Sequence, residues 1–200
     1  MFKSTFARLA GSAHGFSLVD LMLTVAVVGT VAAMAVPSMI NAVDAQRLGI
    51  DTQNVMREMQ LARLNAVTTN RPIRIRFNCP ATGYYRRVEL IGSVNTPNNG
   101  LDADNQAAVR CGTSFPYPAA DNDPLTRPNN DGPVQQLNSK ISITSSQTLE
   151  FWPNGTVHVY NAAVGAPWPQ LGTAPANIIL TKGTTTKSIT VNSLGKMQIQ

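Results

Sequence analysis

The chain has 200 residues, a formal net charge of +5, two cysteines and two histidines. This length allows one membrane helix together with one ordinary globular domain. Scarce histidine and the absence of a Cys-x-x-C motif argue against a zinc site. The serines lack a nucleophile-elbow context, and the sequence has no glycine-rich phosphate loop. The sequence therefore indicates neither an enzyme nor a cofactor site.

An apolar run from Phe16 to Ile40 follows a short leader and carries a single formal charge, Asp20. Roughly 18 or more apolar residues are enough to span a bilayer as a helix. A carboxylate in that setting costs about 2.5–3.5 kcal/mol on insertion scales, so it is treated first as a functional residue. Asp20 either pairs with an amine of its own or a neighbouring chain, or reaches the membrane interface alone.

The start of this run resembles the prepilin-type signal of type IV pilins and type II secretion pseudopilins. The resemblance rests on Gly15-Phe16-Ser17-Leu18, on Asp20-Leu21-Met22 and on Pro37. It implies that prepilin peptidase cuts between Gly15 and Phe16 and that the new amine of Phe16 is methylated. The fifth mature residue is normally Glu in that family. Here it is Asp20, which keeps the charge on a side chain shorter by one methylene.

Lys3 and Arg8 make the leader basic, which places this end on the cytoplasmic side of the membrane. An ordinary secretory signal loses its apolar core on cleavage, whereas a cut before the core retains it. We therefore expect a single-pass protein of the inner membrane with its head in the periplasm or outside the cell. The expected parts are a leader (1–15), a transmembrane assembly half-helix (16–40), an amphipathic half-helix (41–71) and a globular head (72–200).

The pattern after Pro37 predicts a continued helix. Pro37 itself removes a backbone hydrogen bond, so we expect a kink or local melting there. One helical face is predicted to pack on a sheet, and its apolar residues are Val43, Ile50, Val55, Met59, Leu61, Ala62 and Ala66. Asp44, Asp51 and Glu58 interleave with Arg47, Arg57 and Arg63 as charges compatible with a helix. Pro72 ends the helix, with Asn70 or Arg71 as its last residue.

Short strands separated by turn residues dominate the head. Alternation predicts strands over 72–77, 84–91, 140–144, 148–152, 156–160, 177–181 and 187–191. Asn154-Gly155 is a strong hairpin signal. Residues 92–139 read as an irregular insertion, with a short strand possible around 107–111. The fold class is therefore α+β, with a long N-terminal helix packed on an antiparallel sheet or β-sandwich.

Three segments of the C-terminal half resemble the GspH/FimT-type minor pseudopilins. They are 149–156, 178–181 and 188–196, and the stretch from Met56 to Phe77 adds to the likeness. The resemblance does not cover residues 92–139. It implies a minor subunit that helps to initiate or cap a type IV pilus or a type II secretion pseudopilus. Its implied partners are other pilins or pseudopilins in a filament and prepilin peptidase.

Four arginines gather on the first predicted hairpin: Arg74, Arg76, Arg86 and Arg87. Guanidinium clusters of this kind bind phosphate, and some FimT-like pilins resemble DNA receptors for transformation. The alternative function is thus a tip pilin that captures DNA. Those receptors carry an arginine-bearing tail after a final Leu-Gly, whereas here the tail after Gly195 has one cation, Lys196. The competing interpretation is an ordinary solvated strand face.

The remaining candidates are weaker. Cys79 and Cys111 suit an oxidising compartment, and they either form a disulfide or stay as two buried thiols. Five side chains in the insertion could offer oxygen ligands, but they do not follow the EF-hand pattern, so no metal site is predicted. They are Asp102, Asp104, Asn105, Asp121 and Asp123. His14 and His158 are not expected to act as a pair, and His158 is expected on a strand surface.

Overall fold

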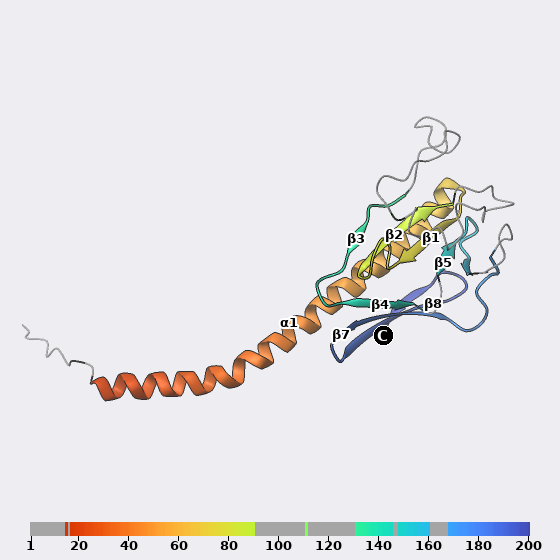
Figure 1. Ribbon diagram of the computed structural model, residues 1–200. Coiled ribbons are helices and arrows are strands. Elements are labelled where there is room, and N and C mark those ends of the chain that lie inside the picture. The colour runs from red at the N-terminus through yellow and green to blue at the C-terminus, as the bar shows by residue number, and fades with distance from the viewer. Residues whose placement is uncertain (1–14, 16, 91–110, 112–130, 146–147, 161–167) are drawn as a thin grey trace, which may run out of the picture. The chain divides into compact units, whose positions relative to one another are not determined.

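The structure is a computed structural model that describes residues 15, 17–90, 111, 131–145, 148–160 and 168–200. The chain divides into two compact units, Met1–Ala42 and Val43–Gln200, and we describe each by itself. The described part of the first unit is helical from Leu18 onward. The second unit, called the head below, holds the rest of that helix and all the strands (Figure 1).

One helix, α1 (Leu18–Thr69), spans 52 residues. The Ser17 hydroxyl accepts a hydrogen bond from the amide of Val19 at 3.3 Å, which satisfies one of the free donors of the first turn. The helix continues through position 37 without interruption, so the local melting predicted there is absent from this structure.

The helix ends one residue before the shortest prediction. Asn70 adopts a positive φ of 54°, and the amide of Arg71 donates to the carbonyl oxygen of Ala66 at 3.3 Å. This left-handed residue and its backward hydrogen bond close the last turn, and Pro72 then prevents continuation.

The strands of the head form two antiparallel sheets. A five-stranded sheet has the order β3-β2-β1-β5-β6, with β1 (Ile73–Phe77), β2 (Tyr84–Glu89), β3 (Gln135–Gln136), β5 (Leu149–Phe151) and β6 (Val157–Val159). A four-stranded sheet has the order β4-β7-β8-β9, with β4 (Ser142–Ser145), β7 (Ala176–Lys182), β8 (Thr185–Val191) and β9 (Met197–Ile199). The predicted α+β class is confirmed.

The seven predicted strands correspond to β1, β2 and β4 to β8. Prediction missed β3 and β9. The segment Gln135–Gln136 is too short for an alternating pattern, and Met197–Ile199 pairs with β8 through Ile189↔Ile199. The possible strand around 107–111 lies outside the described residues, apart from Cys111.

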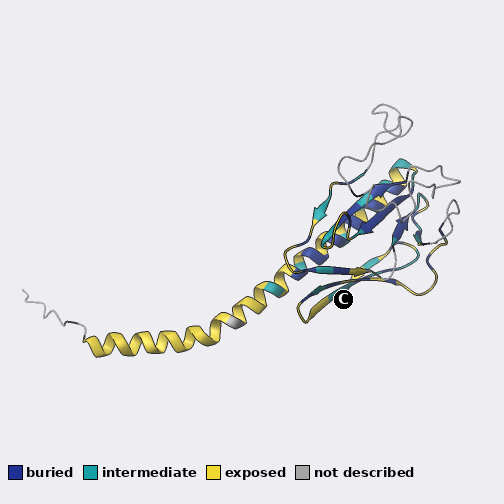
Figure 2. Cartoon of the chain, in the orientation of Figure 1, coloured by how far each residue is buried: buried dark blue, intermediate teal, exposed yellow. Residues whose placement is uncertain are grey.

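The two sheets and the second half of α1 share one hydrophobic core (Figure 2). Its helical members are Leu48, Val55, Met59, Ala62 and Ala66, all fully buried. The prediction that Val43 and Ile50 belong to this face is wrong, because they are 36% and 47% exposed. Leu61 is only half-buried. The buried stripe runs instead through Leu48 and Asp51, and Asp51 is 3% exposed.

Polar side chains of α1 connect the helix to strands and loops of the head. Asp51 accepts hydrogen bonds from the backbone amide and the side-chain amide of Asn138, at 2.7 and 2.8 Å. Glu58 pairs with Arg87 of β2 at 2.7 Å. Asp51 and Glu58, which were predicted only as charges compatible with a helix, therefore bind groups of the head rather than facing solvent.

Cys79 follows β1, and the structure joins it to Cys111 by a disulfide with Cα atoms 5.1 Å apart. Both residues are 1% exposed. The bond ties the described residue Cys111 to the β1–β2 connection. It closes a loop with a sequence separation of 32 residues.

Replacing both cysteines by serine should lower the free energy of unfolding by about 3–4 kcal/mol, because the unfolded chain regains the freedom that this loop closure removes. Denaturant unfolding of the full chain in detergent, with and without reductant, measures this. Reductant should destabilise the wild type and leave the double variant unchanged. A loss below about 1 kcal/mol would contradict a structural role for the bond.

Candidate functional site

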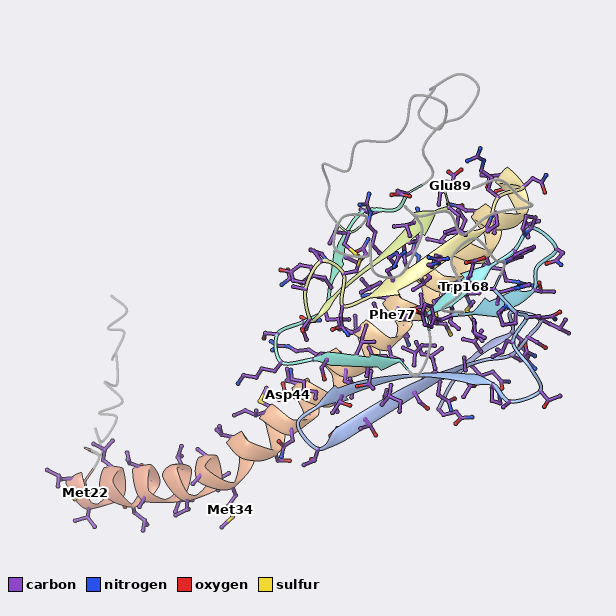
Figure 3. All side chains as sticks on the ribbon, turned by 45° about the vertical axis from the view of Figure 1, so that its right-hand side comes forward. Met22, Met34, Asp44, Phe77, Glu89 and Trp168 are labelled. Atoms are coloured by element: carbon purple, nitrogen blue, oxygen red, sulfur yellow. A yellow bond between two sulfur atoms is a disulfide. The ribbon has the colours of Figure 1, made fainter. Side chains whose placement is uncertain are left out.

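The apolar part of α1 has no covering inside its own unit. Its large hydrophobic side chains between Leu18 and Ile40 are 54% to 80% exposed, and Figure 3 shows Met22 and Met34 projecting from the helix. Within the described residues, α1 is the helix that is long and apolar enough to cross a membrane, with a mean hydropathy of 2.1 over 18 residues and none of them buried. Such a surface needs lipid or other helices around it.

Asp20 lies in the first turn of α1 and is exposed. A carboxylate there is favoured by the partial positive charge of the helix N-terminus. It sits one turn from the implied cleavage junction. Phe16 lies outside the described residues, as does the side chain of Pro37.

Gly15 is exposed, and a Cβ atom added to it would meet no other atom within 4 Å. The described fold therefore places no steric demand for glycine at this position.

The arginine candidates do not form a solvated strand face. Arg74 is fully buried, and its Nε and Nη2 donate to Oε2 of Glu150 at 3.3 and 2.8 Å. The guanidinium carbon also lies 3.6 Å from the ring centroid of Trp168, a cation–π geometry. The other carboxylate oxygen of Glu150 accepts from Nε1 of Trp152 at 2.7 Å. Figure 3 labels Trp168 beside the sheet.

The other three arginines are also engaged. Arg76 and Arg86 are opposite each other in the β1–β2 register and are 4% and 8% exposed. Arg86 donates to the carbonyl oxygen of Gly132 at 2.7 Å and pairs with Asp131 at 3.5 Å. Arg87 points to the other face of the sheet, where it meets Glu58 of α1. The structure therefore does not gather the four candidate arginines on an open strand face: Arg74, Arg76 and Arg86 are buried, and Arg87 is half-buried.

Tyr85 illustrates the environment on the helix side of this sheet. Its ring is 3% exposed, and burial, reinforced by the negative charges of Glu58 and Asp51, raises the pKa of the phenol to about 12. Both effects disfavour the phenolate. Tyr85 therefore stays protonated at neutral pH, and its ring packs in the hydrophobic core.

No group of three or more potential metal ligands occurs in the part of the chain that the structure describes. Asp102, Asp104, Asn105, Asp121 and Asp123 lie outside that part, as does His14. His158 is half-buried rather than on an open strand surface. Its ring stacks on Trp152 with centroids 4.2 Å apart, and its Nδ1 lies 2.6 Å from the Trp168 carbonyl oxygen.

Sequence reasoning missed the cluster around Glu150. Five side chains from different elements form this cluster. They are Arg74 on β1, Glu150 on β5, Trp152 just after β5, His158 on β6 and Trp168 in the segment after β6. A sequence signal was present, because Glu150 lies between two large apolar residues, Leu149 and Phe151, in a predicted strand. A buried acid needs a hydrogen-bonding or charged partner, and the β1–β5 register places Arg74 beside Glu150.

No protein-family profile matches the sequence, and no curated protein matches it at a significant level. Among solved structures, the chain is similar to the minor pseudopilin EpsH from the type 2 secretion system of Vibrio cholerae. The similarity covers 77% of this chain and 96% of that chain, with a TM-score of 0.42 and 10% sequence identity. Because this likeness is weak, the function proposed below rests on the residues of the chain itself.

Replacing Arg74 by Met should destabilise the head by about 3–5 kcal/mol, because Glu150 is then buried without its cation. Adding Glu150→Gln to that variant should restore part of the loss, since no lone charge remains buried. Arg47→Met, at an exposed cation, should change stability by less than about 0.5 kcal/mol. Thermal or denaturant unfolding measures all three, and equal losses in the single and double variants would rule out the buried-charge explanation.

Proposed function

We propose that the chain is a pilin-type structural subunit, anchored by α1 in the inner membrane and assembled into a filament of related subunits. The prepilin-type junction at Gly15-Phe16, followed by an apolar helix with one carboxylate, is the observation that carries this proposal. Prepilin peptidase removes residues 1–15, and the amine of Phe16 is methylated. The function requires no catalytic residue and no cofactor.

The apolar surface of α1 supports a retained anchor. The large hydrophobic side chains from Leu18 to Ile40 stay 54% to 80% exposed, whereas residues from Leu48 onward supply the core of the head. One helix thus combines a segment whose apolar surface suits a lipid environment with a segment that packs against the sheets of the head. After extraction from the membrane, the first segment can be covered only by equivalent helices of other subunits.

Asp20 supplies the specific contact of this assembly. A carboxylate in hydrocarbon is stabilised by a nearby amine, and cleavage before Phe16 creates one about a helical turn away. Pairing Asp20 with the amine of an adjoining subunit fixes the axial step between subunits. Pro37 locally weakens the helix and lets the bundle adjust its packing.

The finer assignment is a minor subunit that initiates or caps the filament, as the GspH/FimT resemblance implies. The disulfide between Cys79 and Cys111 suits a head in the oxidising periplasm. The alternative of a DNA-capturing tip pilin is less favoured, because Arg74, Arg86 and Arg87 pair with carboxylates of the head. Whether the host machine is a pilus or a secretion system follows from the genes that accompany this one.

Gly15→Leu should block processing, because the peptidase must accommodate the residue before the cut and the fold does not require glycine there. Intact-mass measurement of the membrane fraction should find the leader retained, with the head still folded. Ser17→Ala, two residues away, is the matched control and should be processed. Normal cleavage of the Gly15 variant would remove the basis of the proposal.

Asp20→Ala should leave cleavage largely intact and lower assembly, because the amine of the adjoining subunit then has no partner. Asp20→Glu, which restores the side-chain length usual in pilins, should assemble at least as well as the wild type. Co-purification of the subunit with sheared filaments, normalised to its membrane level, measures both. Assembly of Asp20→Ala at the wild-type level would show that this charge does not direct filament formation.

A further inference from the structure

Arg63 of α1 is held between two β-turns of the head. Its Nε donates to the carbonyl oxygen of Gly155 at 3.3 Å. A Cβ atom at Gly195 would lie 2.6 Å from that nitrogen, and one at Gly155 would lie 3.3 Å from Nη2. Both glycines have positive φ, 80° and 72° in chain order. The Val157 amide, which donates to the carbonyl oxygen of Ser193 at 2.9 Å, ties the two turns together.

A groove of about 540 Å³ opens beside this guanidinium. Arg63, Leu64 and Val67 line it from the helix, and Lys196 and Met197 line it from the C-terminal turn. Leu64 and Val67 are 56% and 50% exposed. We call this site the Arg63 groove. It combines two cations with aliphatic side chains that the head leaves uncovered.

No carboxylate of the described head neutralises these cations. The described side-chain carboxylates are Asp44, Asp51, Glu58, Glu89, Asp131 and Glu150, and each is already bonded to another group of the head. Arg63, by contrast, uses its Nε on a backbone oxygen and has no ion pair among the described residues. Its two Nη groups keep the donors that recognise a carboxylate.

We propose that the Arg63 groove binds a short polypeptide segment that carries a carboxylate between aliphatic side chains. The carboxylate meets Arg63 and Lys196, and the aliphatic groups cover Leu64, Val67 and Met197. A nucleic acid fits less well, because the lining offers no aromatic ring for base stacking and too few cations to follow a backbone. This proposal rests on the filament function given above, in which the molecules beside the head are other subunits. The bound segment therefore belongs to a neighbouring filament subunit.

The test uses the full chain in detergent micelles and two synthetic probes, acetyl-Leu-Glu-Val-Leu-amide and the same peptide with Gln in place of Glu. Amide resonances of Gly155, Gly195 and Lys196 report binding in NMR titrations. The Glu peptide should shift these resonances and bind about tenfold more tightly than the Gln peptide, as expected for a charged hydrogen bond. The Gln peptide also corrects for partition of apolar peptides into the micelle.

Three variants separate the groove from general electrostatics. Arg63→Gln should weaken binding of the Glu peptide about tenfold. Gly195→Ala should do the same while keeping both cations, because the new methyl group displaces the Arg63 side chain. Arg47→Gln removes one exposed charge outside the groove and should leave binding unchanged. Thermal unfolding of each variant checks that the head remains folded.

Equal affinity for the two peptides would overturn the proposal, as would binding that survives Arg63→Gln. Absence of shifts up to about 5 mM peptide would also overturn the proposal, because a dissociation constant above about 5 mM is too weak for a specific docking site. A DNA duplex that shifts the same amides when the Glu peptide does not would replace the polypeptide by a nucleic acid. Each of these results concerns the groove alone, whereas failure of the Gly15 and Asp20 variants to behave as expected concerns the filament function.

Discussion

The structure depends on how one helix divides its side chains between two environments. Up to Ile40 the large hydrophobic residues of α1 stay exposed, and from Leu48 onward an apolar stripe is fully buried against two sheets. Burial of apolar surface is the main favourable term in folding. The head obtains that term within the chain, whereas the first segment must obtain it from lipid or from other subunits. This constraint supports the structural role proposed above.

Inside the head, charged side chains connect the helix and strands to one another. Glu58 and Asp51 attach α1 to β2 and to Asn138, and Arg74 pairs with Glu150 beneath Trp168. A buried ion pair adds little net stability, but removing one partner is costly. These pairs therefore act mainly as constraints on register and orientation. The cations left at the surface, Arg63 and Lys196 among them, are the groups available for partners.

Much of the fold was predictable because hydrophobic periodicity reports burial. Ile73, Ile75 and Phe77 alternate along β1, and the Asn154-Gly155 turn lies between β5 and β6 as expected. The side of α1 that packs on the sheets was predicted only in part. Val43 and Ile50 belong to one helical stripe and Leu48 to another, and both stripes contain apolar residues. Position relative to the sheets decides between them, and that position is a property of the tertiary structure.

The arginine face shows a second limit of sequence reasoning. Alternation correctly placed Arg74 and Arg76 on the face opposite Ile73 and Ile75, but polar residues on a strand normally face solvent. The partner that buries Arg74 is Glu150, which is 76 residues away in the chain. Trp168 comes from a segment with no periodic pattern. In contrast, the proposed junction at Gly15 rests on the sequence alone, because the residues on both sides of Gly15 lie outside the described part of the chain.

The most direct test of this account is the N-terminal residue of the mature protein. Mass spectrometry of the chain purified from membranes should find an N-methylated phenylalanine, Phe16, followed by the complete apolar helix. That result would mean that the exposed surface of α1 is kept and must be covered by lipid or by neighbouring subunits. A mature chain that begins after Ile40 would contradict the account, because the apolar run would then be a discarded secretory signal and the head a protein released without an anchor.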